Sequence, residues 1–311
     1  MSGRQAPRWD IAAGRSCLLI GSLLLGLTLS TSTGHAEPVT DAGDSEMITN
    51  LLFIHHSCGG QLLADPGTQV GGRHDTGYRC IYESHPNGGG LRGLIETKGI
   101  TVNELSYESR LGEDTDIEHW RVKFTDHMDE LVRVRKQDEF LPDGQLNSII
   151  AFKSCYPNND YVGHGEEPGD PDSPVRTVAN SQAAYASLLP IFQEHPEILF
   201  IAVTAPPRAE PEPKGFKQKV AALFKGKPKD AQFAREFNTW MSDQQGGWLK
   251  DYPLSNVVVF DYYDVLTENG QSDWSRFPTG DGSDSHPSVD GNRLAAQEFM
   301  RVLEGGLNGM H

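Results

Sequence analysis

The chain lacks any long apolar stretch beyond residue 29, which excludes a membrane-spanning helix from most of its length. Its one extended apolar run, residues 17–29, follows three arginines and precedes small residues at Gly34-His35-Ala36. That order is typical of a secretory signal peptide. We therefore expect residues 1–36 to be a cleaved signal peptide, the mature protein to be secreted or periplasmic, and no stable membrane insertion after cleavage. An uncleaved N-terminal anchor is the alternative.

Basic residues are also scarce. The chain has 27 Lys and Arg against 43 Asp and Glu, a formal charge of −16. Without residues 1–36 these become 24 and 42, a formal charge of −18. Such a surface repels nucleic acid and anionic membranes, so we expect no nucleic-acid partner. The lysines between residues 214 and 229 are a local exception, typical of a solvated loop.

Cysteine is nearly absent after the signal, where only Cys58, Cys80 and Cys155 remain. In an oxidising compartment one pair can close. Cys58 and Cys155 follow strands that we expect to be neighbours, whereas Cys80 could instead tie the segment after the first strand to Cys58. Three buried free thiols are the remaining alternative.

Recognised metal-binding patterns are missing. The spacing of His55, His56, His74 and His85 fits no structural zinc site and no His-Glu-x-x-His motif. The acidic loop at residues 163–174 lacks the ordered ligand spacing of a calcium loop and is expected to be a flexible lid. We therefore expect neither a metal nor an organic cofactor.

Five short apolar runs alternate with helical patterns along the chain. Continuous apolar runs of this length are typical of parallel strands covered on both faces. The alternation predicts an α/β fold: a flavodoxin-like three-layer sandwich with a five-stranded parallel sheet and helices on both faces. The expected strands are 51–54, 100–105, 148–153, 198–204 and 257–261, and the main expected helices are 91–98, 183–192, 231–244 and 293–303.

Length and composition suit one domain after the signal. With 37% hydrophobic and 23% charged residues, we expect residues 37–311 to form a single globular domain. Glycine-rich and proline-rich stretches predict insertions near residues 61–90 and 206–230. Polar residues of the first insertion are candidates to line a substrate cleft: Arg73, His74, Asp75, Tyr78 and His85.

A serine follows the first expected strand. Ser57 comes after the run Leu51-Leu52-Phe53-Ile54-His55-His56 and is followed by Cys58-Gly59-Gly60. The carboxyl end of a parallel strand is where ligands bind in such sheets. The glycines allow a tight turn with backbone amides free for an anion. Ser57 is therefore a candidate nucleophile; a helix N-cap is the simpler interpretation.

A histidine and an acid precede the last expected helix, in Ser283-Asp284-Ser285-His286-Pro287. Serine needs a base at neutral pH, and a histidine oriented by a carboxylate is the usual one. His286 and Asp284 are the candidates, with Asp281 in reserve. After the third expected strand, Asn158 could direct a side-chain N–H at a developing oxyanion.

In the order of these candidate residues along the chain, and in their positions beside expected strands and helices, the chain resembles the SGNH (GDSL-type) hydrolases. The resemblance extends from about Met47 to Leu303. Ser57, Gly112, Asn158 and His286 match the family's serine, glycine, asparagine and histidine. The resemblance implies a catalytic triad of Ser57, His286 and Asp284. It also implies an oxyanion hole made by the backbone N–H groups of Ser57 and Gly112 and the side chain of Asn158.

The chain departs from the family at two places. His55-His56-Ser57 replaces Gly-Asp-Ser, and the acid lies two residues before His286 rather than three, as in alginate-type O-acetyltransferases. We therefore expect a secreted esterase that hydrolyses an O-acyl ester, such as an acetyl ester on a carbohydrate. An O-acyltransferase and a non-catalytic carbohydrate-binding protein are the alternatives. His119 and Trp120 either shape the pocket for a sugar or acyl group or pack as ordinary residues.

Overall fold

A seven-stranded sheet forms the centre of the described structure, in the order β10-β9-β8-β1-β5-β6-β7. The computed structural model describes residues 49–72, 79–112, 114–211 and 230–310. Its strands are β1 (Thr49–His55), β5 (Ile100–Ser106), β6 (Val134–Lys136), β7 (Glu139–Phe140), β8 (Asn147–Lys153), β9 (Leu199–Val203) and β10 (Val257–Phe260).

The five expected strands are all present and parallel to their neighbours, as β1, β5, β8, β9 and β10. Their order is the flavodoxin-like one, with β1 between β5 and β8. The predicted number of strands is wrong, because β6 and β7 extend the sheet beyond β5. These strands have three and two residues, and runs this short carry no readable periodicity.

Alternate residues of the strands enter two separate cores. Leu52 and Ile54 of β1 face one core, whereas Leu51 and Phe53 face the other, and all four side chains are fully buried. This is the period of two that an extended strand imposes on a sheet covered on both faces. Each such side chain contributes roughly 1.5–3 kcal/mol to folding through burial.

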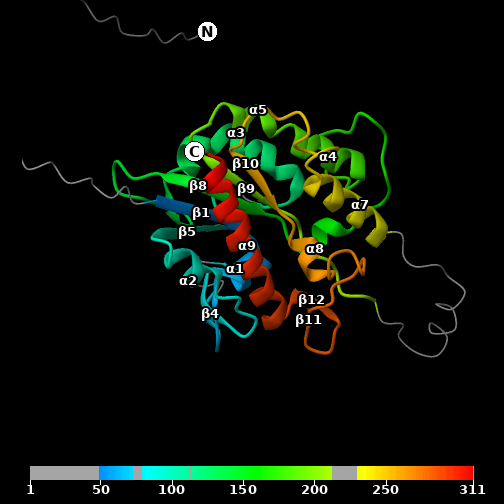
Figure 1. The fold of residues 1–311 in the computed structure, drawn as a ribbon, viewed down its shortest axis with the longest axis horizontal. Coiled ribbons are helices and arrows are strands. Elements are labelled where there is room, and N and C mark those ends of the chain that lie inside the picture. The colour runs from blue at the N-terminus through cyan, green and yellow to red at the C-terminus, as the bar shows by residue number, and fades with distance from the viewer. Residues whose placement is uncertain (1–48, 73–78, 113, 212–229, 311) are drawn as a thin grey trace, which may run out of the picture. The chain divides into compact units, whose positions relative to one another are not determined.

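Helices cover both faces of the sheet, as predicted (Figure 1). Residues of α3 (Trp120–Leu131), α4 (Val178–Ala186), α5 (Leu189–Gln193) and α7 (Asp230–Ser242) enter the core that contains Leu52. Residues of α1 (Ser57–Leu63), α2 (Leu91–Glu96), α8 (Tyr262–Leu266) and α9 (Val289–Gly309) enter the core that contains Leu51. The single helix predicted at 183–192 is two helices, with Pro190 in the first turn of α5.

Two small sheets lie outside the central one. The first, in the predicted insertion at 61–90, consists of β2 (Asp65–Pro66), β3 (Val70–Gly71) and β4 (Tyr82–His85). The second is the antiparallel ribbon of β11 (Pro278–Thr279) and β12 (Asp284–Pro287), directly before α9. β12 carries both residues predicted to assist Ser57, so this ribbon positions them.

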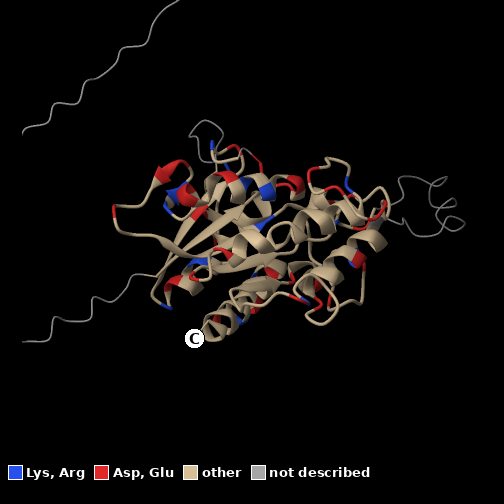
Figure 2. Ribbon diagram, turned by 90° about the horizontal axis from the view of Figure 1, so that it is seen from above, with Lys and Arg blue, Asp and Glu red and all other residues tan. Residues whose placement is uncertain are grey.

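The predicted signal peptide at 1–36, the cleft candidates Arg73 to Tyr78 and the lysine-bearing segment all lie outside the described residues. Among the helices that are described, none has the length and apolar character needed to cross a membrane. Acidic residues occupy loops and helix ends around the described body, with Lys and Arg interspersed (Figure 2).

Candidate active site

Ser57 lies where β1 passes into α1, at the carboxyl edge of the sheet. β1 ends at His55, His56 is the N-cap of α1, and Ser57 is the first helical residue. Gly59 and Gly60 are needed for close packing rather than for anion binding. A Cβ on Gly59 would lie 2.3 Å from the Cβ of His55, and one on Gly60 would lie 1.8 Å from the Cys80 carbonyl oxygen. The N–H groups of both glycines donate to the His56 carbonyl, so the expectation of free amides there is wrong.

The hydroxyl of Ser57 contacts the imidazole of His286. Ser57 Oγ lies 2.9 Å from His286 Nε2 although the two residues are 229 positions apart. On its other side, His286 Nδ1 lies 2.7 Å from Asp284 Oδ1. A hydrogen on Nδ1, donated to this carboxylate, leaves Nε2 free to accept the proton of the serine. The structure thus brings together the three residues that the sequence singled out as nucleophile, base and acid.

The two-residue spacing of Asp284 and His286 lets one carboxylate oxygen hold both the ring and the backbone of the histidine. Asp284 Oδ1 also accepts the backbone N–H of His286 at 3.0 Å. Partial burial raises the pKa of Asp284, but the backbone and side-chain hydrogen bonds from His286 outweigh it and the pKa lies below its ordinary value. Asp281, the reserve candidate, instead accepts hydrogen bonds from the backbone and hydroxyl of Ser283.

Neighbouring loops hold His286 in place. Thr279 Oγ1 donates to the His286 carbonyl at 2.8 Å, and Asn87 Nδ2 donates in turn to Thr279 Oγ1 at 2.8 Å. The ring of Tyr156 meets the imidazole edge to face, with centroids 5.1 Å apart, and the Arg208 guanidinium lies over Tyr156. The first insertion and the loop after β8 therefore both support the base.

His56 is a close neighbour of Ser57 for which the sequence predicted no role in the site. Its ring is stacked on Tyr107, with centroids 4.0 Å apart and an interplanar angle of 9°. Its Nδ1 accepts the backbone N–H of Ser57 at 2.9 Å and lies 3.3 Å from Ser57 Oγ. The only sequence signal that His56 would contact the nucleophile was its position directly before Ser57. His56 occupies the Ser57 N–H that was predicted to serve the oxyanion hole.

The other two predicted oxyanion residues also make structural contacts, Asn158 through its donor group and Gly112 through its carbonyl group. Asn158 has no exposed surface; its Nδ2 donates to Asp116 Oδ1 at 2.6 Å and its Oδ1 accepts the Ile117 N–H. Gly112 adopts φ = +66°, and its carbonyl accepts a hydrogen bond from Lys123 Nζ. Both residues therefore shape the loop between β5 and α3, which leads to the candidate site.

Trp120 belongs to the core. It is fully buried, its Nε1 donates to Ser154 Oγ at 2.9 Å, and its ring packs against Phe124 and Phe152. Of the two interpretations of this tryptophan, the ordinary packed residue is therefore the correct one.

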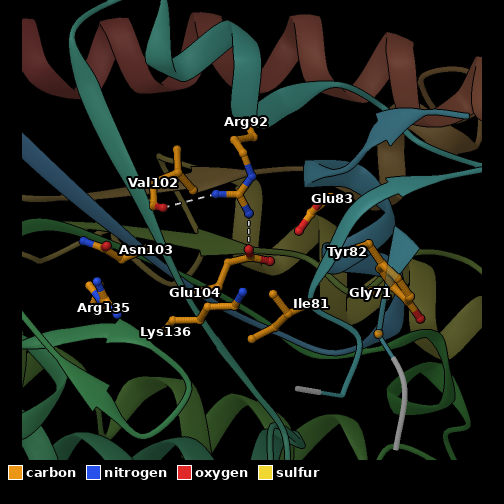
Figure 3. A pocket seen from close by; sticks show the side chains of 11 residues that line it. Gly71, Ile81, Tyr82, Glu83, Arg92, Val102, Asn103, Glu104, Arg135 and Lys136 are labelled. Carbon is orange, nitrogen blue, oxygen red and sulfur yellow. Dashed lines mark hydrogen bonds and ion pairs between the residues drawn. The ribbon is translucent and has the colours of Figure 1, made fainter. Parts of the chain in front are cut away.

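Buried hydrogen bonds connect the histidine pair to Glu104 and Arg92. His55 is fully buried, with Nε2 3.0 Å from Glu104 Oε1 and Nδ1 2.9 Å from the His56 carbonyl. Arg92 binds the other oxygen of Glu104 (Figure 3). Burial raises the pKa of Glu104, but the bonds from His55 and Arg92 outweigh it and lower the pKa. A cavity of about 700 Å³ beside Arg92 and Glu104 is lined by neither Ser57 nor His286.

Within the described ranges, no group of three His, Cys, Asp or Glu side chains is placed to hold a metal ion. His55 and His56, two members of the zinc interpretation considered above, are instead bound to Glu104 and to Ser57. The geometry around Ser57 suits proton transfer and nucleophilic attack by the chain's own side chains.

No protein-family model and no curated protein matches this chain. Solved structures do match it. A Bacteroides fragilis protein assigned as an acylhydrolase has 11% identity and a TM-score of 0.42, with 85% of this chain and 90% of that chain covered. The catalytic domain of the Streptococcus pneumoniae peptidoglycan O-acetyltransferase OatA has 10% identity and a TM-score of 0.39, with 84% and 96% covered. Phospholipase A1 from Streptomyces albidoflavus has 11% identity and a TM-score of 0.40, with 83% and 99% covered.

These matches have low identity, 10% or 11%. They include enzymes of acyl hydrolysis and of acyl transfer. At TM-scores below 0.5 they carry no argument about the activity or substrate of this chain. The contacts around Ser57 are what indicate the chemistry of this site.

Proposed function

We propose that the chain is a serine esterase that hydrolyses an O-acyl ester through Ser57, His286 and Asp284. The observation that supports this most directly is the continuous contact from the Ser57 hydroxyl through both nitrogens of His286 to the Asp284 carboxylate. Two of these residues come from opposite ends of the described chain. Their convergence at the carboxyl edge of a parallel sheet is what a nucleophilic site on this fold requires.

In the proposed reaction, His286 Nε2 takes the proton of Ser57 as Oγ attacks the ester carbonyl carbon. Asp284 holds the ring in the needed tautomer and stabilises its charged form. The tetrahedral oxyanion then collapses, His286 protonates the departing alcohol, and an acyl-serine remains. Water, activated by the same histidine, attacks the acyl-serine and releases the acid. No cofactor enters these steps.

Oxyanion stabilisation in this proposal uses the donors predicted from the sequence, namely the N–H groups of Ser57 and Gly112 and the side chain of Asn158. For Ser57, the N–H must leave His56 Nδ1 when substrate binds, and the buried Asn158 must turn Nδ2 from Asp116 toward the site. Catalytic hydrogen bonds often form only in the substrate complex. One such donor is worth roughly 100- to 1000-fold in turnover.

We propose a small-molecule or carbohydrate O-acyl ester, such as an acetyl ester, as substrate and a secreted or periplasmic location. The location rests on the arginine-preceded apolar run of residues 17–29. The acidic composition argues against nucleic acid and other polyanions as partners. Tyr156 beside His286 offers an aromatic surface suited to a sugar or acyl group.

The test is covalent labelling of the full chain with a fluorophosphonate, followed by mass spectrometry. We expect a single adduct on Ser57, because among the described residues only this hydroxyl is positioned against a base that is itself held by an acid. Ser57→Ala and His286→Ala should each lower the rate of p-nitrophenyl acetate hydrolysis at least about 1000-fold, with nearly unchanged thermal unfolding.

His127→Ala is the matched control, since His127 also pairs with a carboxylate but lies on α3 with Glu130. It should retain full activity. Labelling at another serine, or full activity in Ser57→Ala, would falsify the assignment. Glycan binding without any labelling would favour the non-catalytic carbohydrate-binding protein.

An O-acyltransferase on the same site is the second candidate, favoured by the two-residue spacing of Asp284 and His286. In that case an acceptor hydroxyl replaces water in the second half of the reaction. Adding acceptor sugars during turnover separates the two: a transferase forms acylated sugar and less free acid, whereas an esterase releases the same amount of acid.

A further inference from the structure

Two cysteine thiols lie against each other directly beside the candidate nucleophile. Cys58 Sγ and Cys155 Sγ are 3.4 Å apart, and Cys155 Sγ lies 3.5 Å from Ser57 Oγ. Cys58 is the second residue of α1, and Cys155 directly precedes the short helix η3 (Tyr156–Asn159). The proposed ester hydrolysis uses neither thiol.

A buried cation accompanies the pair. Lys153, the last residue of β8, is fully buried; its Nζ donates to the Ser154 carbonyl at 2.9 Å and lies over the ring of Tyr262. A carbonyl and an aromatic ring carry no formal charge, whereas a buried ammonium requires compensation. The charge of Lys153 lowers the pKa of the nearby Cys155 thiol.

The two thiols differ in acidity. Burial raises the pKa of Cys155, but its contacts with the Cys58 thiol and His56 and the charge of Lys153 outweigh it, so the pKa lies well below its ordinary value. Burial and the neighbouring Cys155 raise the pKa of Cys58. In thiol–disulfide chemistry the thiol with the lowered pKa is the one that attacks, which favours Cys155 as the attacking sulfur of the pair.

The pair is also close enough to bond with little movement. A disulfide has an S–S distance of about 2.05 Å, so the two sulfur atoms need to approach by about 1.4 Å. Cys80, the third thiol, contacts the Tyr107 hydroxyl at 3.9 Å instead. Between the two pairings left open by the sequence, the contacts favour Cys58 with Cys155.

We propose that Cys58 and Cys155 are a redox couple whose disulfide ties the nucleophile-bearing end of α1 to the loop after β8 and raises the turnover of Ser57. The effect on turnover rests on the proposed esterase function; the disulfide does not. In the reduced form, a Cys155 thiolate competes with His286 for the serine proton and places negative charge beside the developing oxyanion. The disulfide removes both obstacles.

A peroxide supplies the oxidising equivalents. The Cys155 thiolate attacks one oxygen of hydrogen peroxide, breaks the O–O bond, and forms a sulfenic acid as the departing hydroxide takes up a proton to become water. The Cys58 sulfur then attacks the Cys155 sulfur and loses its proton, and the hydroxyl leaves as a second water. Two thiols are oxidised and one peroxide is reduced to two waters.

The experiment treats the reduced full-length chain with hydrogen peroxide, alkylates remaining thiols after unfolding, and maps peptides by mass spectrometry. We expect one linked peptide pair, Cys58 with Cys155, two hydrogen atoms lighter than the reduced peptides, and an alkylated Cys80. The linked form should melt about 5–10 °C higher, because the bond closes a loop of 97 residues. Dithiothreitol should reverse both changes.

Hydrolysis of p-nitrophenyl acetate is measured before oxidation, after it and after reduction. We expect oxidation to raise kcat at least about five-fold, the factor that one elementary charge at about 4 Å gives even at the dielectric constant of water. Cys80→Ser is the matched control and should show the same link and the same rise. Cys58→Ser should show neither.

A Cys58–Cys80 link, or peroxide treatment that leaves Cys58 and Cys155 unlinked, overturns the redox couple. A correct link with an unchanged or lower kcat overturns its effect on turnover. Absence of hydrolysis in both redox states refutes the esterase proposal, whereas peptide mapping still decides the disulfide.

Discussion

At the scale of single residues, the candidate site depends on a few side chains whose contacts reach across the chain. His286 touches Ser57 with one nitrogen and Asp284 with the other. The side chain of Asp284 is 49% exposed. Water therefore competes for this carboxylate and screens its charge, so Asp284 orients the ring more than it stabilises it electrostatically.

This exposure determines how much activity we expect to be lost when the acid is replaced. Asp284→Asn should lower kcat/KM for p-nitrophenyl acetate by about 10- to 100-fold, less than the roughly 10⁴-fold typical of a buried triad aspartate. Asp281→Asn is the matched comparison, because Asp281 lies in the same turn but binds Ser283. Its kcat/KM should stay within about two-fold of the unmodified chain. A greater loss in Asp281→Asn than in Asp284→Asn would reverse the assignment of the acid.

At the scale of elements, the turn from β1 into α1 decides where Ser57 lies. α1 packs so closely on its neighbours that Gly59 and Gly60 have no room for a side chain. The pair of glycines was visible in the sequence, and so was the strand before it. The reason for Gly60 was not visible, because it depends on Cys80, a residue that lies in the insertion after the helix.

Gly60→Ala tests this close approach. Its Cβ would lie 1.8 Å from the backbone carbonyl oxygen of Cys80, so the turn or the insertion must shift. We expect the free energy of unfolding, measured in urea, to fall by about 3 kcal/mol. Gly93→Ala in α2 is the control, because a Cβ there meets nothing within 4 Å. It should raise the free energy of unfolding by about 0.5–1 kcal/mol. Equal effects of the two substitutions would rule out the steric explanation.

At the scale of the whole molecule, buried charges link stability to pH. Lys123 of α3 is fully buried and donates to the carbonyls of Leu111 and Gly112. Burial lowers its pKa from 10.5 to about 8, against the opposing effect of Asp114 and Asp138. The folded chain thus binds fewer protons at this site than the unfolded chain between these two pH values. The cost of burying the charge is fully present below about pH 8 and is relieved as the pH rises.

We therefore expect Lys123 to make the free energy of unfolding increase with pH. Between about pH 7.5 and about pH 9.5, the unmodified chain should gain up to about 2 kcal/mol relative to Lys123→Met. Other titrating groups are common to both chains and largely cancel in the comparison. Urea unfolding at both pH values measures it. A constant difference between the two chains would show that Lys123 has its ordinary pKa when folded.

Much of the architecture was predictable because strand periodicity is local information. The five long strands, their order and the helices on both faces follow from apolar runs and their alternation with helical patterns. The short strands β6 and β7 could not be predicted, since the pairing of β6 with β5 and of β7 with β6, rather than sequence pattern, makes them strands. Pro190 marks the break between α4 and α5 in the sequence, because proline is favoured in the first turn of a helix.

The sequence by itself determined the strands, the serine at the end of the first of them and the Asp-x-His motif before the last helix. The backbone conformation of two turns decided that Asp284 rather than Asp281 meets His286 and that His56 occupies the Ser57 N–H. Only the tertiary structure decided that His286 meets Ser57 and that Cys58 meets Cys155. Secondary structure depends on neighbours along the chain, which the sequence displays. Contacts between residues far apart depend on where the packed strands and helices place their ends. Those positions are fixed only when both cores have formed on the two faces of the sheet.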